Sequence, residues 1–169
     1  MTKSNFKNKY FFGLLLLVAC FFASCGDEED QCRQNMYVVM NLNFYQSVID
    51  EEGAQKNSPL SLTLTAQGEG IDSLLYNNDI RSAITLPLNK LDNHSTFALT
   101  LNDTTGTLTV WHSNTEEYLS FECGCLVTFK IDSVQYAGQF IDSLSVINVD
   151  INTQNAENIQ LYRHYDTRQ

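Results

Sequence analysis

Apolar and polar residues alternate one by one through much of the chain beyond residue 36, and this alternation constrains the fold more than any other feature. Side chains of a strand point alternately to opposite faces, so a period of two indicates half-buried strands. Two final strands are expected within residues 141–151 and 159–165, so the body is expected to be all β. The apolar positions of the clearest runs are Met40, Leu42 and Phe44; Leu60, Leu62 and Leu64; Ile84, Leu86 and Leu88; Phe97, Leu99 and Leu101; and Leu108 and Val110.

The longest alternating run extends from Leu119 to Ile131, where seven apolar residues share one parity. It predicts one long strand, which Gly124 should bend or bulge near its middle. Turn residues separate the other runs. Residues 102–106, which lie between two alternating segments, predict the clearest β-hairpin.

Strands with one buried and one solvated face predict an antiparallel two-sheet β-sandwich of the immunoglobulin-like kind. A closed β-barrel is the alternative. Residues 46–52 and 152–158 are the two segments that could instead form short helices. Residues 35–169 are expected to form one domain, because a chain of this length can bury a sizeable core.

The first thirty residues predict the destination of the protein. Three lysines precede an apolar run at residues 10–23, and four acids follow Cys25. A basic head, a short apolar stretch and small residues before a cut are typical of a secretory signal peptide. At about 1.5 Å per residue the run would span about 21 Å, which is short of a hydrocarbon core of about 30 Å. We expect residues 1–24 to be removed and residues 25–34 to form an acidic tether.

Two cysteines compete for a lipid in this segment. Cys20 has the better residue at the first position of a lipobox, but cleavage before it would expose Phe21 and Phe22 at the mature N-terminus. Cleavage before Cys25 uses the whole apolar run, so we expect acylation there, with several acyl chains inserted in the outer membrane. A plain secreted protein is the alternative. A Ser-Cys junction followed by acids resembles lipoproteins of the Bacteroidota, which implies display on the cell exterior.

The charge limits the classes of possible partner, and the cysteine count limits the possible disulfides. Seven basic residues against twenty acids leave the expected mature chain with a formal charge of −13. Such a chain repels nucleic acid and anionic head groups, so no nucleic-acid partner is expected. Outside the cytoplasm thiols tend to pair, and one disulfide is expected from Cys32 to Cys123 or Cys125, with Cys123 preferred. A disulfide between Cys123 and Cys125 would close a very small ring.

No recognisable catalytic or metal-binding motif appears. The histidines His94, His112 and His164 lie far apart, and no pair has metal-ligand spacing on a helix. The acids at 116–117 and 50–52 fall in expected loops, where solvated charge is the usual role. We therefore expect neither an enzyme nor a metal or cofactor; a hydrolase with an unrecognised triad or carboxylate pair is the remaining catalytic alternative.

One aromatic residue is a candidate for ligand binding. The apolar neighbours of Trp111 have inward parity, so its indole should point outward, where it could stack on a sugar ring or a partner's side chain. Tyr37 and Tyr45 could extend that surface. The structural alternatives are a tryptophan that covers a sheet edge and tyrosines packed beneath a loop. His112 has inward parity, which suggests that the strand ends or bulges there.

Four short motifs are also familiar: Leu42-Asn43-Phe44-Tyr45, Leu74-Leu75-Tyr76-Asn77-Asn78, Leu86-Pro87-Leu88 and Ser120-Phe121-Glu122-Cys123-Gly124. They resemble an uncharacterised family of Bacteroidota lipoproteins, a domain of unknown function, over most of residues 32–165. The resemblance implies a β-type envelope lipoprotein and supplies no binding or catalytic residue. The expected function is a non-enzymatic binding or structural module with a protein or glycan partner; the alternative is a carbohydrate-binding module of a glycan-uptake system.

Overall fold

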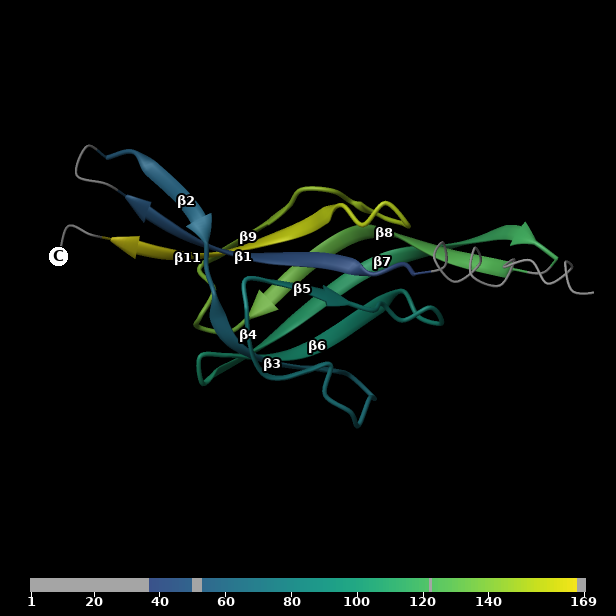
Figure 1. Ribbon diagram of the computed structural model, residues 1–169, viewed down its shortest axis with the longest axis horizontal. Coiled ribbons are helices and arrows are strands. Elements are labelled where there is room, and N and C mark those ends of the chain that lie inside the picture. Colours follow the sequence, from purple (N-terminus) through teal and green to yellow (C-terminus); the bar gives the residue numbers. More distant parts are fainter. Residues whose placement is uncertain (1–36, 50–52, 122, 167–169) are drawn as a thin grey trace, which may run out of the picture. The chain divides into compact units, whose positions relative to one another are not determined.

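The computed structural model describes residues 37–49, 53–121 and 123–166 (Figure 1). These residues form eleven strands and no helix. Within them, therefore, no helix is long and apolar enough to cross a membrane. The strands are β1 (Met40–Ile49), β2 (Gln55–Pro59), β3 (Leu62–Gly68), β4 (Tyr76–Arg81), β5 (Ala83–Leu86), β6 (His94–Leu101), β7 (Thr104–Ser120), β8 (Gly124–Ala137), β9 (Ser143–Val146), β10 (Asp150–Ile151) and β11 (Glu157–Asp166).

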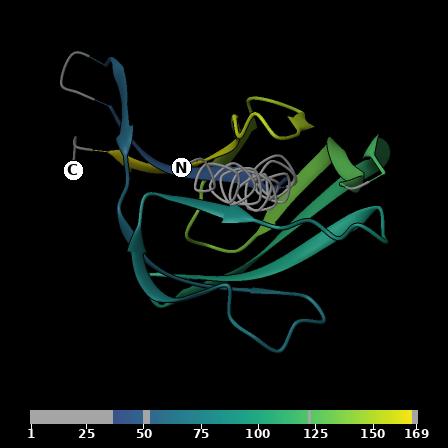
Figure 2. The ribbon, with the colours of Figure 1, turned by 45° about the vertical axis from the view of Figure 1, so that its right-hand side comes forward.

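The strands form two layers (Figure 2). Sheet A has the order β2-β1-β11-β9, with β5 also paired to β1, and sheet B has the order β10-β8-β7-β6-β3-β4. Neither sheet closes on itself, so the predicted β-sandwich is confirmed and the barrel alternative is wrong. The prediction of short helices is also wrong. Residues 46–49 continue β1, where β2 and β11 satisfy both sides of the backbone, and residues 152–156 form a turn.

Sheet A departs from the prediction in one respect, because it is mixed rather than purely antiparallel. Strands β1 and β11 pair in parallel, from Leu42 beside Ile159 to Ile49 beside Asp166. Alternation has the same period in both kinds of ladder, so it carries no information on strand direction. A side chain secures the register shift at the start of this pair. The buried Asn158 accepts a hydrogen bond from the N–H of Asn41 at 2.9 Å and donates to the carbonyls of Asn148 and Asp150 at 3.1 Å each.

The core lies between the sheets and consists of the residues that alternation placed inward. Met40, Leu42 and Phe44 of β1 are fully buried, as are Leu99 of β6 and Leu108 of β7. Full burial of one such side chain contributes about 1.5–3 kcal/mol. The shorter alternating runs therefore predicted the buried face correctly. The run at residues 119–131 did not, since Phe121 is 91% exposed, whereas Leu126, which has the opposite parity, is buried.

Two hairpins differ in how well the sequence predicted them. The β6–β7 turn is confirmed and consists of Asn102 and Asp103, with φ of 44° and 69°, as a tight two-residue hairpin turn requires. The single strand expected across residues 119–131 is wrong, because the chain reverses there. Gly124 does not bend a strand but begins β8 at φ 72°, opposite Ser120. The outer end of this β7–β8 hairpin, residues 118–121 and 123–125, extends beyond the rest of the sandwich, and we call it the arm (Figure 1).

Candidate ligand-binding face

The outer surface of sheet A carries a continuous set of polar and aromatic side chains. Strands β1 and β11 lie side by side, so that Asn43 is beside Gln160 and Tyr45 is beside Tyr162. Most of these side chains are half-buried, as expected for residues in the middle of a sheet with one solvated face. We call the set the polar face; it consists of Asn41, Asn43, Tyr45, Glu157, Gln160, Tyr162 and His164.

A chain of hydrogen bonds fixes the two tyrosines of the polar face. The Tyr45 hydroxyl donates to one carboxylate oxygen of Glu157 at 3.1 Å, and the Gln160 amide donates to the other at 2.9 Å. The Tyr162 hydroxyl in turn donates to the carbonyl oxygen of Gln160. The two rings lie 5.7 Å apart between centroids and are tilted by 31°. The rings are therefore held in place before any ligand arrives.

The electrostatics of this chain keep the Tyr162 hydroxyl protonated. Burial raises the pKa of Tyr162 above its ordinary value of 10.0, and the neighbouring Tyr45 and Glu157 raise it further. The Tyr162 hydroxyl consequently stays a neutral donor at neutral pH. His164 continues the row, since its ring lies 6.4 Å from that of Tyr162 and its Nε2 lies 2.8 Å from the Ser143 hydroxyl.

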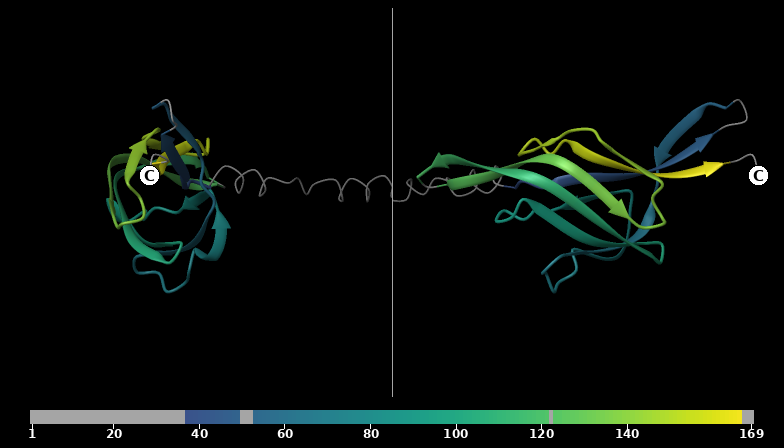
Figure 3. Two further views of the ribbon diagram at one scale, coloured as in Figure 1. Left: turned by 90° about the vertical axis from the view of Figure 1, so that its left-hand side faces the viewer. Right: turned by 180° about the vertical axis from the view of Figure 1, so that it is seen from behind.

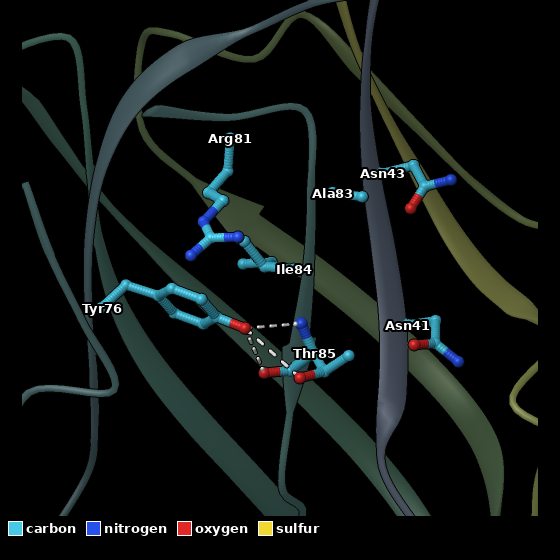
Figure 4. A pocket seen from close by; sticks show the side chains of 7 residues that line it. All are labelled: Asn41, Asn43, Tyr76, Arg81, Ala83, Ile84 and Thr85. Atoms are coloured by element: carbon cyan, nitrogen blue, oxygen red, sulfur yellow. Dashed lines mark hydrogen bonds between the residues drawn. The ribbon is translucent and has the colours of Figure 1, made fainter. Parts of the chain in front are cut away.

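An open pocket of about 340 Å³ adjoins the polar face where β1, β5 and β4 meet. In Figure 4 the side chains of Tyr76 and Arg81 lie on one side of β5, and Asn41 and Asn43 on the other. The two asparagines belong to both the pocket and the polar face. This volume is at the lower end for ligand pockets, which is enough for one ring-sized group. The lining residues are Asn41, Asn43, Tyr76, Arg81, Ala83, Ile84 and Thr85.

Hydrogen bonding fixes one wall of this pocket and leaves another wall free to bind. The Tyr76 hydroxyl accepts the backbone N–H of Thr85 at 2.9 Å, which ties the edge strand of sheet B to β5 of sheet A. Among the described residues, Arg81 makes only one long contact, 3.8 Å to Asp79, and 54% of its side chain is exposed. Its guanidinium donors are therefore available to oxygen atoms of a ligand.

Residues 61–163 match the model of the "Family of unknown function (DUF6452)". The chain belongs to this family. No curated protein and no solved structure matches the chain. The DUF6452 match begins just before β3 and ends within β11, so it contains Tyr76 and Arg81 of the pocket and Tyr162 of the polar face, but not β1.

The aromatic residues singled out from the sequence do not come together in this DUF6452 chain. Trp111 points outward as predicted and is 37% exposed, but it lies on β7 of sheet B. Tyr45 lies on the outer side of sheet A, and Tyr37 precedes β1 and is 61% exposed. Sequence reasoning found Tyr45 and missed Glu157, Gln160 and Tyr162. The outward parity of Gln160 and Tyr162 was readable, but Glu157 has the same parity as the buried Ile159 and faces outward only because the register shifts at Asn158. The position of all three residues beside β1 was not readable.

The predicted lipid and disulfide sites are only partly within the described chain. Cys25 and Cys32 lie outside the described residues. Cys125 is free and exposed, which excludes a bond between Cys123 and Cys125. Cys123 is not free. Its pairing with Cys32 stays a prediction.

A buried polar cluster beneath the loop at residues 89–93 has the connectivity of a Ser-His-Asn relay. His112 is fully buried, its Nε2 lies 2.9 Å from the Ser95 hydroxyl, and its Nδ1 lies 2.7 Å from Oδ1 of Asn114. The Asn114 amide N–H groups donate to loop carbonyls, so its oxygen faces His112 and accepts from Nδ1. Nε2 is then the acceptor for Ser95. Strand β7 continues through His112, and its register with β8 shifts between Trp111 and His112.

The bonds of this cluster identify it as a clamp on the loop. The Ser95 hydroxyl accepts the N–H of Asn89 at 2.8 Å, and Asn114 donates to the carbonyls of Lys90 at 3.0 Å and Asp92 at 2.8 Å. Ser95 is only 6% exposed, so the hydroxyl that a hydrolase would use as nucleophile is covered. In the described part of the chain, no group of three His, Cys, Asp or Glu residues has an arrangement that could hold a metal ion.

Proposed function

We propose that this DUF6452 protein is a non-enzymatic binding module, anchored in the outer membrane by an acylated Cys25 and displayed on the exterior of a cell of the Bacteroidota. The signal-like first 24 residues and the acids after Cys25 support the anchor and its location. The polar face with its adjoining pocket supports binding. The buried state of the Ser95 hydroxyl supports a structural role for the relay rather than a catalytic one.

The occupant that the polar face fits best is a neutral glycan. The observation that carries this choice is the preformed chain Tyr45–Glu157–Gln160–Tyr162, which presents ring surfaces beside amide and carboxylate groups. Sugar rings offer apolar C–H faces for the rings and hydroxyls for the amides. The seven residues of the polar face include no aliphatic side chain, whereas the centre of a protein interface is usually apolar. The excess of acids over bases disfavours an anionic polysaccharide.

A glycan array probed with the mature domain tests this function. Tyr162→Ala is expected to weaken binding of any captured neutral glycan about tenfold or more, because it removes a ring and breaks the chain to Gln160. Trp111→Ala is the matched control on sheet B and should leave the affinity unchanged. Loss of binding in the Trp111 variant alone would show that the glycan binds on sheet B rather than on the polar face. A folded wild type that captures no neutral glycan would refute the glycan proposal.

The anchor has its own test, which is independent of the ligand. In cells fed a radiolabelled fatty acid, Cys25→Ala is expected to abolish label incorporation, because it removes the thiol that carries the acyl chains. Cys125→Ala is the matched control and should keep the label, although that thiol is free and exposed. Cys20→Ala should also keep it. Label that survives Cys25→Ala but not Cys20→Ala would place the lipid on the competing cysteine.

A further inference from the structure

The end of the arm exposes apolar side chains that nothing in the described structure covers. Tyr118 is 66% exposed, Leu119 is 38% exposed and Phe121 is 91% exposed. All three lie within four residues of one another where β7 ends and the chain turns toward β8, and we call them together the tip. Glu122 lies outside the described residues and is no part of it. Single exposed apolar residues are ordinary, but a projecting cluster with two aromatic rings indicates a contact surface.

The position of the arm in the domain indicates what the tip contacts. Figures 1 and 3 show that β1 begins at the end of the sandwich from which the arm projects, whereas the end of β11 lies at the opposite end. The parallel pairing of β1 with β11 agrees with this arrangement. The two strands run in the same direction and Ile49 lies beside Asp166, so both strands end on the side opposite the start of β1. The chain therefore enters the domain on the same side as the arm. A lipid attached upstream of β1 holds this end toward the bilayer.

We propose that the tip, Tyr118, Leu119 and Phe121, docks on the lipid surface to which Cys25 is anchored. This inference rests on the proposed lipid anchor. Met40 lies fifteen positions after Cys25, and a chain of that length reaches at most about 54 Å. The stretch from Tyr118 to Phe121 extends about 10 Å at roughly 3.3 Å per residue. The tether is therefore long enough to let the tip reach the bilayer while the acyl chains remain inserted.

The side chains of the arm are suited to shallow insertion into the interface between the membrane and water. Interfacial elements bury their apolar groups about 5–10 Å deep. Glu117 lies four residues behind Phe121, about 13 Å along the strand, so its exposed carboxylate stays in water when the tip enters. Tyr118 suits the boundary because its ring is apolar and its hydroxyl is polar. The acidic chain favours zwitterionic over anionic head groups.

A single tryptophan makes the docking measurable, since Trp111 is the only one in the chain. The full lipidated protein carrying Trp111→Phe and Phe121→Trp is incorporated into phosphatidylcholine vesicles with brominated acyl chains. The indole at position 121 is expected to shift its emission to the blue and to lose at least half of its intensity. The wild type reports from Trp111, and Trp111→Phe with Lys56→Trp reports from β2 at the opposite end; both should keep their intensity. Circular dichroism verifies that each variant is folded.

The outcomes distinguish a failure of the tip docking from a failure of the lipid anchor. Protein that floats with the vesicles while the indole at position 121 is quenched no more than the one at position 56 would overturn the docking and leave the anchor standing. Protein that fails to float would overturn the anchor and the docking together. The same chain without residues 1–24 and with Cys25→Ala should not float, because three side chains that insert shallowly into the membrane interface are too few to hold a domain on a membrane.

Discussion

Replacing His112 with alanine is expected to lower the free energy of unfolding by about 3–4 kcal/mol, the range for a fully buried side chain that also carries hydrogen bonds. The ring packs edge-on against Phe129 at 5.2 Å and 84°, and its loss leaves a cavity. It also leaves the Ser95 hydroxyl without its acceptor in a buried position. Urea unfolding followed by circular dichroism measures the change.

His94→Ala is the matched control for this prediction. His94 is exposed and its ring has one long contact, 3.4 Å to its neighbour Asn93. Its removal should change the free energy of unfolding by less than about 0.5 kcal/mol. Hydrogen exchange of the His112 N–H, which donates to the carbonyl of Asn93 at 2.9 Å, reports the state of the loop in wild type. A His112→Ala protein as stable as His94→Ala would contradict the assignment of the cluster as a clamp.

The sequence predicted most of the core because burial and strand geometry impose the same period. Residues such as Leu42, Leu64, Leu99 and Val110 were expected to face inward, and all four are fully buried. Alternation is local, however, and it cannot report a reversal of the chain. The apolar residues before and after the β7–β8 turn share one parity in the sequence, so two strands resemble one.

The polar face was only half predictable for a related reason. The outward position of Tyr45 followed from its own strand, but its hydrogen-bond partner Glu157 lies 112 residues away. No turn or spacing indicates that β1 and β11 are parallel neighbours. The pocket beside them depends in addition on Tyr76 crossing from one sheet to the other, which is a tertiary contact without a local signal. Composition and periodicity therefore set the fold class, whereas strand order created the candidate site.

The second large effect concerns Gly106, a buried glycine of β7. A Cβ atom placed there would lie 2.3 Å from the hydroxyl oxygen of Tyr136 and 2.5 Å from its Cζ atom. Gly138 confines the same ring, since a Cβ at that position would also lie 2.5 Å from the hydroxyl oxygen. Gly106→Ala is therefore expected to lower the free energy of unfolding by about 2–3 kcal/mol through overpacking. Thermal and urea unfolding of the purified domain measure this.

Two further substitutions show whether steric conflict with Tyr136 is the cause. Tyr136→Leu in the Gly106→Ala background should recover at least about 1 kcal/mol, because it removes the atoms in conflict and neighbouring sites couple by that much. Gly68→Ala is the matched control, since its nearest contact, 2.9 Å, is the flexible end of Ile71, and it should cost less than about 1 kcal/mol. Tyr136→Phe alone should be neutral or stabilising, because the described part of the chain offers its buried hydroxyl no hydrogen-bond partner. Additive effects in the double variant would show that Gly106 is required for a reason other than room for this ring.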